Sequence, residues 1–406
     1  MQKFEKHSPV VVTEVTTKHE LRQFMQYPNR LYADNPNYIP SFYGDDLSDW
    51  TPGKNPAFDY CEARCWLARR DGEIVGRIGA ILSHKANDKF GTHRMRFSQV
   101  DFVDDSEVSA ALFGTVERWA REKGCDQVHG PLGFTDMDRE GMLVEGFDRR
   151  SLFFTNYNAP YYLEHLTRLG YRKDVDWIEY RITVPEPGGA EAERLHKLSE
   201  FILKRKHLHV ATVHHKSEYG PFVRQVFELV NAAYAPLYGV VELSDEQIER
   251  YANKFIPLVD PDFVCFVVDE QDQLVAFGVT ALDPSVALKH SDGRLFPFGW
   301  AGVLNGLHHS DTLIMLLTAV RPDLQTEGIN AVMMDHVCQS CNRHGVRFAE
   351  TGPMLELNDH ILAQWKRLEK EQHKRRRCFI KDLDHDVNAA NAAEAQTETP
   401  ETESAE

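Results

Sequence analysis

One stretch of the sequence, residues 313–341, joins an apolar strand to a helix through a short polar loop (LIMLLTAVRPDLQTEGINAVMMDHVCQSC). The first N–H groups of a helix have no partner inside the helix, and the helix dipole is positive at that end. Such a junction binds anions, and a pyrophosphate is the anion that suits it. We therefore predict that a cofactor is bound here by Ala319, Val320, Gln325, Thr326, Glu327, Gly328, Ile329 and Asn330.

Two further polar residues follow this helix. Glu350 ends a predicted strand. Its carboxylate could take a proton from an amine, directly or through water, or it could be a surface or capping carboxylate without a catalytic role. Asn358 begins a predicted helix over residues 358–368. Glu350 is therefore a candidate catalytic residue.

A second polar and aromatic cluster lies earlier in the chain. The run HGPLGFTDMDREGMLVEGFD over residues 129–148 is followed by NYNAPYY over residues 156–162. Glycines supply backbone freedom, amides supply hydrogen bonds and tyrosines supply faces for stacking, as an acceptor-binding loop requires. The predicted substrate-binding residues are Asn156, Asn158, Tyr161 and Tyr162, although the two tyrosines could equally fill a core.

The cysteines do not predict a metal site. Cys338 and Cys341 lie three apart on a predicted helix, and Cys61 and Cys65 lie four apart near a strand. A structural zinc site needs four ligands, and neither pair has a consistent pair of partners, so packing thiols are the better interpretation. We expect no metal.

Composition excludes several classes of protein. The 406 residues carry a formal net charge of -16, which argues against nucleic acid as a partner. No apolar run approaches the roughly 20 residues that span a bilayer. Scattered cysteines without a signal peptide predict a cytoplasmic protein with reduced thiols. The last segment, residues 384–406, is acidic and lacks Lys, Arg and aromatic residues, so we expect it to be disordered.

The order of predicted elements repeats along the chain. Each half has helices, a hairpin of two β-prone segments, a further strand, a helix and another strand. In the first half the hairpin is predicted at residues 64–69 and 73–82, and in the second half at 263–269 and 274–282. The Pro- and Gly-rich segment 181–193 separates the halves. We predict a mixed α/β fold with two tandem domains, residues 1–185 and 193–383.

At the loop after its apolar strand the chain resembles the GNAT acetyltransferase superfamily, whose cofactor loop follows the pattern Gln/Arg-x-x-Gly-x-Gly/Ala. Gln325 and Gly328 match the pattern, and Asn330 departs from it. The family often carries Asn-x6-Tyr-x2-Leu on a later helix, and Asn358 to Leu368 reproduces the spacing with Trp365 in place of the tyrosine. The resemblance makes Asn358 a second candidate catalytic residue. In the family this tyrosine commonly protonates the departing thiolate, which an indole N–H does not do.

The resemblance implies two tandem GNAT domains with acetyl-CoA or a longer acyl-CoA as cosubstrate, bound by the second domain. In the first domain, Asp104 and Asp105 stand where a glycine loop would lie, so we predict that this domain does not bind CoA in the standard way. The bacterial double-GNAT proteins that the chain resembles are described as N-acetyltransferases. The implied partner is a small-molecule or peptide amine. The alternative is a catalytically degenerate GNAT pair that acts as a small-molecule or protein binding module; the oligomeric state is left open.

Overall fold

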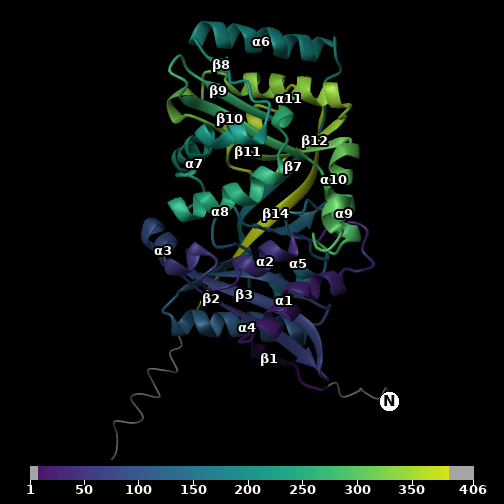
Figure 1. Cartoon of the computed structure of the whole chain (residues 1–406). Coiled ribbons are helices and arrows are strands. Elements are labelled where there is room, and N and C mark those ends of the chain that lie inside the picture. Colours follow the sequence, from purple (N-terminus) through teal and green to yellow (C-terminus); the bar gives the residue numbers. More distant parts are fainter. Residues whose placement is uncertain (1–7, 384–406) are drawn as a thin grey trace, which may run out of the picture.

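The computed structural model describes residues 8–383 and places their strands in one continuous, mostly antiparallel sheet of 14 strands (Figure 1). Its main path runs β1-β2-β3-β4-β5-β14-β7-β12-β11-β10-β9-β8, with β6 paired to β14 and β13 paired to β7. The mixed α/β fold predicted from the sequence is confirmed. Residues 384–406, for which disorder is predicted, lie outside the described part of the chain.

The first half of the chain supplies one end of the sheet. Its strands are β1 (Val11–Glu14), β2 (Cys61–Arg70), β3 (Glu73–Ser83), β4 (Arg94–Phe102), β5 (Gln127–Gly130), β6 (Met142–Glu145) and β7 (Arg172–Thr183). Its helices are α1 (Lys18–Leu31), α2 (Tyr43–Asp49), α3 (His84–Phe90), α4 (Ser106–Glu122) and α5 (Tyr162–Arg168). The predicted hairpin is confirmed as β2 and β3.

The second half supplies the other end. Its strands are β8 (His209–Val210), β9 (Val264–Val268), β10 (Leu274–Leu282), β11 (Thr312–Val320), β12 (Phe348–Glu350), β13 (Met354–Leu355) and β14 (Lys370–Asp382). Its helices are α6 (Ala190–Lys206), α7 (Gly220–Tyr234), α8 (Asp245–Phe255), α9 (Ser285–His290), α10 (Gly299–His309), α11 (Asn330–His344) and α12 (Asp359–Ala363).

The halves are joined by an exchange of strands at the centre of the sheet. β14, the last strand of the chain, lies between β5 and β7, and β7 in turn lies between β14 and β12. Each half therefore completes its sheet with a strand from the other, and β14 crosses between them in Figure 1. The predicted domains 1–185 and 193–383 describe the sequence repeat, but their backbones are hydrogen-bonded to each other.

The helices pack on the sheet with the spacing that the sequence predicts. On α4, Val108, Leu112 and Val116 recur every four residues and are fully buried against β3 and β4. Asp105, one residue before the helix, is its N-cap and accepts the N–H of Glu107 at 2.8 Å. In the second half, α11 packs against the sheet and α6 covers α11 at the outer end of the molecule (Figure 1).

Several elements differ from the prediction. α1 continues through Pro28 to Leu31, and Pro28 is buried within it. The loop expected over residues 28–58 contains α2. The helix predicted at 358–368 is the short α12, and the helix predicted from residue 328 begins at Asn330. Neither α9 nor α10 was predicted, since residues 284–311 mix Gly, Pro and aromatic residues without a regular period.

Candidate functional site

The two parallel strands at the centre of the second half separate from each other. β11 and β12 pair only over residues 312–314 of β11, and β11 continues to Val320. The register between β10 and β11 shifts between Val279 and Thr280, which leaves Leu316 as an extra residue in β11. A bulge of this kind disrupts the ladder locally and re-aims the backbone. The sheet therefore opens into a gap lined by backbone groups.

The loop after β11 leads to an uncapped helix N-terminus, as the anion-site prediction requires. Gly328 adopts a left-handed φ of 81°, which a residue with a Cβ rarely adopts. Ile329 occupies the N-cap position of α11, and no side chain of the described residues caps the helix. Glu327 forms an ion pair with Lys206 of α6 at 2.6 Å, which fixes the loop against the neighbouring helix. The Ala331 and Val332 N–H groups donate to the carbonyl oxygens of Gly328 and Ile329 at 2.9 Å, so an anion bound here would depend on the amides that precede them in the loop.

The predicted cofactor residues divide into two groups. Ala319, Val320 and Ile329 are buried, so only their backbones can take part in binding. The remaining residues lie at the surface or partly exposed and border the loop: Gln325, Thr326, Glu327, Gly328 and Asn330. Gln325 donates from Nε2 to the carbonyl oxygen of Val320 at 3.3 Å, which closes the turn. Their role in cofactor binding stays a prediction.

An apolar pocket, called here the channel, lies between α11 and the strands β10, β11 and β12. Asn330 and Trp365 both line it, and Ile182 of β7 and Leu195 of α6 add to the lining. Its lining includes Gly278, Thr280, Met315, Leu317, Met333, Met334, Val337, Cys338, Cys341, Ala349 and Leu368. A channel of this composition accepts an extended, mostly apolar group that carries an anion at one end.

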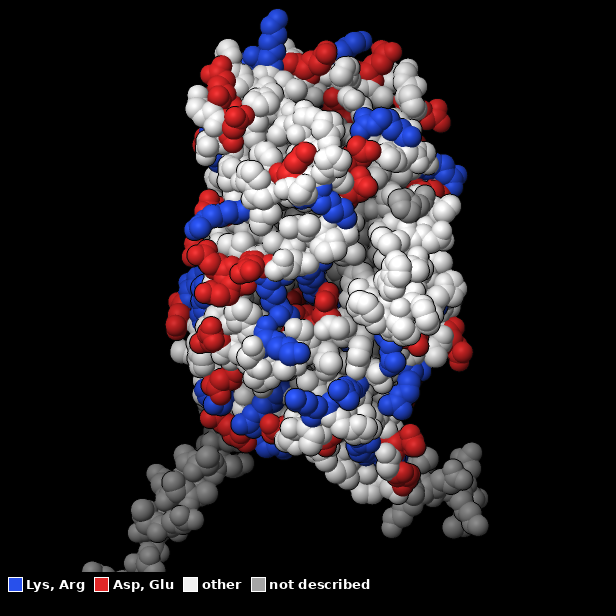
Figure 2. All heavy atoms as spheres, viewed as in Figure 1, with Lys and Arg blue, Asp and Glu red and all other residues white. Residues whose placement is uncertain are grey.

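A second, more polar pocket lies between the halves of the chain. Its aromatic lining is Phe42, Trp50, Phe134, Phe153, Phe154 and Phe255. Its charged lining has the acids Asp45, Asp46, Asp49 and Asp138 and the basic residues Arg139 and Lys254. Figure 2 shows the surface hollowed near α2 and α8, with charged atoms inside. Phe154 connects this pocket to the bulge, because a Cβ on Gly352 would lie 3.5 Å from its ring and 3.4 Å from the carbonyl oxygen of Met315.

Burial and neighbouring charges shift the pKa values of two residues in this interdomain pocket. Burial, together with the charge of Asp49, raises the pKa of the Asp138 carboxyl to about 6. Asp138 also accepts the N–H of Phe134 at 2.8 Å, which holds the carboxyl in place. Burial would lower the pKa of Lys254, but Asp49 and Asp45 outweigh burial and raise it. The sequence singled out the run 129–148 that contains Asp138, but nothing in it indicated that α2 and α8 would enclose this residue.

Glu350 belongs to a buried ion network on the two exchanged strands. Its carboxylate oxygens lie 3.3 Å from Arg181 Nη1 and 3.2 Å from Lys374 Nζ. Burial would raise the pKa of the neighbouring Glu179, but Arg376 and Lys374 hold it below its ordinary value. Because both oxygens of Glu350 contact cations, removing its charge would disturb the centre of the sheet. Its role as a base stays a prediction.

Asn358 and Trp365 both have structural tasks. Asn358 is the N-cap of α12 and accepts the N–H of Ile361 on Oδ1 at 3.2 Å. The Trp365 side chain is buried, and its indole N–H points at Met354 Sδ at 3.2 Å. The catalytic role predicted for Asn358 is untested, and its side chain already serves the helix start.

The corresponding gap in the first half is closed. β4 also carries a bulge, with Gln99 at a φ of 46°, and it pairs with β5 only over residues 94–96. Here, however, the chain after β5 continues along β4, because the Leu132 N–H donates to the carbonyl oxygen of Phe97 at 3.0 Å. The buried Arg96 donates to the carbonyl oxygens of Gly133 and Phe134. The loop 131–141 thus fills the space that is open in the second half.

The helix N-terminus in the first half is occupied as well. Asp105 caps α4, and Arg70 binds the Asp105 carboxylate at 2.6 Å. Hydrogen bonding from Arg70 holds the pKa of Asp105 below its ordinary value, so the charge remains. A pyrophosphate here would meet a fixed carboxylate. This geometry favours the prediction that the first domain does not bind CoA in the standard way.

The predicted substrate residues of the first half lie mainly in the core. The Tyr162 hydroxyl is buried and contacts the Tyr32 hydroxyl at 2.7 Å. Asn158 bonds the backbone of Leu143 with both its oxygen and its nitrogen. Tyr161 donates to the Phe102 carbonyl oxygen. For the tyrosines the structure favours the core alternative that the sequence left open. Asn156 and Asn158 border a small cavity next to Arg139, so a binding role for them stays a prediction.

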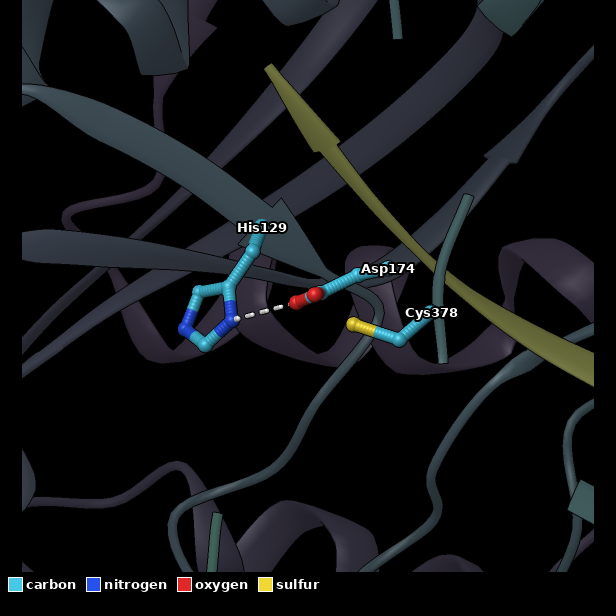
Figure 3. A group of neighbouring side chains, drawn as sticks. All are labelled: His129, Asp174 and Cys378. Carbon is cyan, nitrogen blue, oxygen red and sulfur yellow. Dashed lines mark ion pairs between the residues drawn. The ribbon is translucent and has the colours of Figure 1, made fainter. Parts of the chain in front are cut away.

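One group of side chains among residues 8–383 has a spacing that could hold a metal ion (Figure 3). His129, Asp174 and Cys378 place their ligand atoms within 4.8 Å of one another. The Tyr238 hydroxyl lies among them, 3.0 Å from His129 Nδ1 and 3.4 Å from Cys378 Sγ, and it donates to Asp174. Burial lowers the pKa of His129 to about 4 and raises that of the Cys378 thiol. These side chains form a hydrogen-bonded network that ties Tyr238 of the second half to the first.

The fold and the opened strands define a tandem GNAT architecture, and solved structures agree. The chain has a TM-score of 0.52 and 14% identity to a tandem GNAT protein from the clavulanic acid biosynthesis pathway, over 92% of this chain and 99% of that one. It has the same TM-score and 11% identity to a GCN5-related glucosamine N-acetyltransferase region of a fungal multi-domain β-N-acetylglucosaminidase, over 92% of this chain and 38% of that one. The predicted GNAT resemblance is thus confirmed for the fold.

Sequence relatives extend the comparison. The chain is 27% identical to Protein YghO of Escherichia coli (strain K12) over 379 residues, which is 92% of this chain and 95% of that protein. It is 28% identical to the Bacterial ceramide synthase of Caulobacter vibrioides over 300 residues, which is 72% of this chain and 75% of that protein. No protein-family model matches the chain. No helix among residues 8–383 is long and apolar enough to cross a membrane.

Proposed function

We propose that the protein is an acyltransferase that moves an acyl group from acyl-CoA to an amine. The observation that carries the proposal is the difference between the two halves. The gap between β11 and β12 opens into an apolar channel beside an uncapped helix, whereas the equivalent gap in the first half is filled. A pantetheine-like arm suits the channel and its pyrophosphate suits the start of α11. GNAT proteins use acyl-CoA in general, which supports the same donor here.

The amine would approach from the interdomain pocket. Phe154 lines this pocket and Met315 lines the channel, and both lie beside Gly352, so the two cavities lie on either side of these residues. The acids Asp45, Asp46 and Asp49 pair with Lys254, Arg139 and Arg250, and an ammonium group would join this set of ion pairs. The surrounding phenylalanines suit a hydrocarbon chain. This combination favours an amphiphilic amine as the acceptor.

The reaction that this arrangement supports is direct attack. The amine nitrogen forms a bond to the thioester carbon, the carbon–sulfur bond breaks, and CoA leaves as a thiolate that takes up a proton. Backbone N–H groups at the bulge of β11 would stabilise the carbonyl oxygen in the transition state. Asp138 is a candidate for removing the ammonium proton, because a pKa of about 6 leaves it ionised near neutral pH. Glu350 is the other candidate carboxylate.

The name of one relative narrows the proposed substrates. The protein from Caulobacter vibrioides is named a ceramide synthase, and a ceramide is an N-acylated long-chain amine. We therefore place a long-chain amine in the interdomain pocket and a long-chain acyl-CoA, in preference to acetyl-CoA, in the channel. The methionines that line the channel, Met315, Met333 and Met334, suit a flexible apolar chain.

A calorimetric titration of the purified chain with acetyl-CoA and with palmitoyl-CoA tests the donor. Micromolar affinity for palmitoyl-CoA with one site per chain, followed by mass-spectrometric detection of N-palmitoyl product from sphinganine, is the expected result. Product from acetyl-CoA alone would remove the long-chain assignment. The absence of binding by either thioester would remove the enzyme assignment.

The second candidate function is a catalytically degenerate pair that binds a ligand without turnover. Trp365 favours it, because it replaces the tyrosine of the family pattern and its indole N–H already contacts Met354. The two candidates differ in one measurement. Palmitoyl-CoA that binds tightly but releases no free thiol in the presence of any amine would support the binding module.

A further inference from the structure

An apolar surface projects from α9, α10 and the segment between them. Five large apolar side chains are exposed there, and they are called here the α9–α10 patch: Val286 (55% exposed), Phe296 (80%), Phe298 (80%), Trp300 (47%) and Leu304 (48%). Figure 2 shows a broad uncharged area where Figure 1 places these helices. Contiguous exposed aromatic side chains of this kind mark an interaction site.

The patch is presented by a segment that is itself anchored. Leu288 and Val303 are buried and pack with Ile314 of β11 and Phe153. The Tyr43 N–H donates to the carbonyl oxygen of Gly293 at 3.0 Å. Asn29 Nδ2 donates to the carbonyl oxygen of Asp292 at 3.1 Å. Because the inner side of the segment already has its core contacts, the outward aromatic residues are available to a partner.

Charge and area indicate which partner covers the patch. The chain carries 62 acids in 406 residues, yet residues 293–310 contain none and include Arg294 and His309. At about 150–250 Å² for a large side chain, the five residues expose roughly 600 Å², below the about 800 Å² per partner of a stable protein interface. Phe and Trp side chains beside Arg294, without acids over residues 293–310, instead match a segment that inserts into the headgroup region of a bilayer.

We propose that the α9–α10 patch docks the protein on the surface of a lipid bilayer. Phe296, Phe298 and Trp300 would enter the headgroup region, with Arg294 beside the anionic lipids. The buried side of the same segment packs with Phe42 and Phe153, which line the interdomain pocket. A docked protein would therefore hold the mouth of that pocket close to the bilayer. Docking does not depend on the proposed acyl transfer, but it would supply a long-chain amine to it.

Vesicle flotation tests the proposal with the full chain and no substrate. The probes are vesicles of phosphatidylcholine alone and of phosphatidylcholine with 30% phosphatidylglycerol, at low and high salt. The test variant is Phe296→Ser/Phe298→Ser. The matched control is Phe201→Ser/Leu357→Ser, because Phe201 and Leu357 are 57% and 80% exposed but lie away from the patch. Thermal unfolding of all three proteins checks that each is folded.

The expected result is that the wild type floats with the mixed vesicles and that the test variant loses at least tenfold in partition coefficient, while the control variant does not change. High salt should weaken binding only in part, because the apolar insertion is not screened. Equal flotation of the test variant and the wild type would overturn the proposal. A wild type that stays in solution would also overturn the proposal. The same holds if the wild type is a dimer and the test variant is a monomer. Failure of acyl transfer would leave the flotation result unaffected.

Discussion

The variant Gly328→Val tests the predicted cofactor site, and Gly345→Val at the other end of α11 is its matched control. Gly328 stands at a φ of 81° just before α11, and Gly345 stands at a φ of 71° just after it. A side chain at either position costs about 1–2 kcal/mol in backbone strain. A Cβ on Gly328 would meet only the tip of Ile202 at 3.2 Å, and one on Gly345 would meet nothing within 4 Å. We therefore expect similar losses of stability from Gly328→Val and Gly345→Val.

Only Gly328→Val should lose the cofactor. Its side chain would stand where the loop backbone approaches the pyrophosphate and would remove about two charge-assisted hydrogen bonds. At about 1.5–3 kcal/mol each, the loss is roughly 3–6 kcal/mol, or about 10²–10⁴ in affinity. Calorimetric titration with CoA gives the affinities, and thermal unfolding gives the stabilities. If Gly345→Val weakened CoA binding as much as Gly328→Val, the loop after β11 would not be the phosphate site.

Three further predictions concern the stability and the CoA stoichiometry of variants at charged side chains. Because burial raises the pKa of Asp138 to about 6, the folded protein keeps a proton that the unfolded chain releases near pH 4. The wild type should therefore lose on the order of 2–3 kcal/mol of unfolding free energy relative to Asp138→Asn as the pH rises from 4 to 6. A difference between the two proteins that stays constant with pH in urea titrations would contradict this. Arg376→Met should cost about 3–5 kcal/mol in chemical unfolding, because the buried Glu179 would keep only the more distant of its two cations, Lys374 at 3.5 Å. Glu179→Leu/Arg376→Met should cost less. Asp105→Ala should cost about 1 kcal/mol through the lost cap without adding a second CoA site, so a calorimetric stoichiometry of two would refute the closed first half.

Local chemistry made much of the fold predictable. Alternating β-prone segments around Arg70-Asp71-Gly72 fixed the β2–β3 hairpin, and an apolar run followed by a polar loop located β11 and the start of α11. α12 was predicted too long because the pattern that supported it was a family spacing, and the chain turns after Ala363 to feed β14. Such an end is set by the neighbouring strand and not by the helix residues.

The site itself was only half predictable. The predicted phosphate loop is contiguous in sequence, so residues 319–330 could be proposed from their own pattern, and their binding role stays a prediction. The interdomain pocket joins Asp49, Asp138 and Lys254, which lie far apart in sequence and acquire a shared environment only when α2 and α8 close over the loop 131–141. Glu350 was chosen for its place at a strand end, but its two cationic neighbours come from β7 and β14.

The sequence alone indicated most of the strands, the long helices and their repeated order, because backbone preference and hydrophobic period act over a few residues. Only the tertiary structure decided that β7 and β14 exchange places at the centre of one sheet, since strand pairing between segments 200 residues apart depends on packing that no local pattern encodes. It also decided which of two similar gaps stays open. In the first half Leu132 and Arg96 close the gap with hydrogen bonds, and in the second half the gap ends at Trp365 and remains a channel.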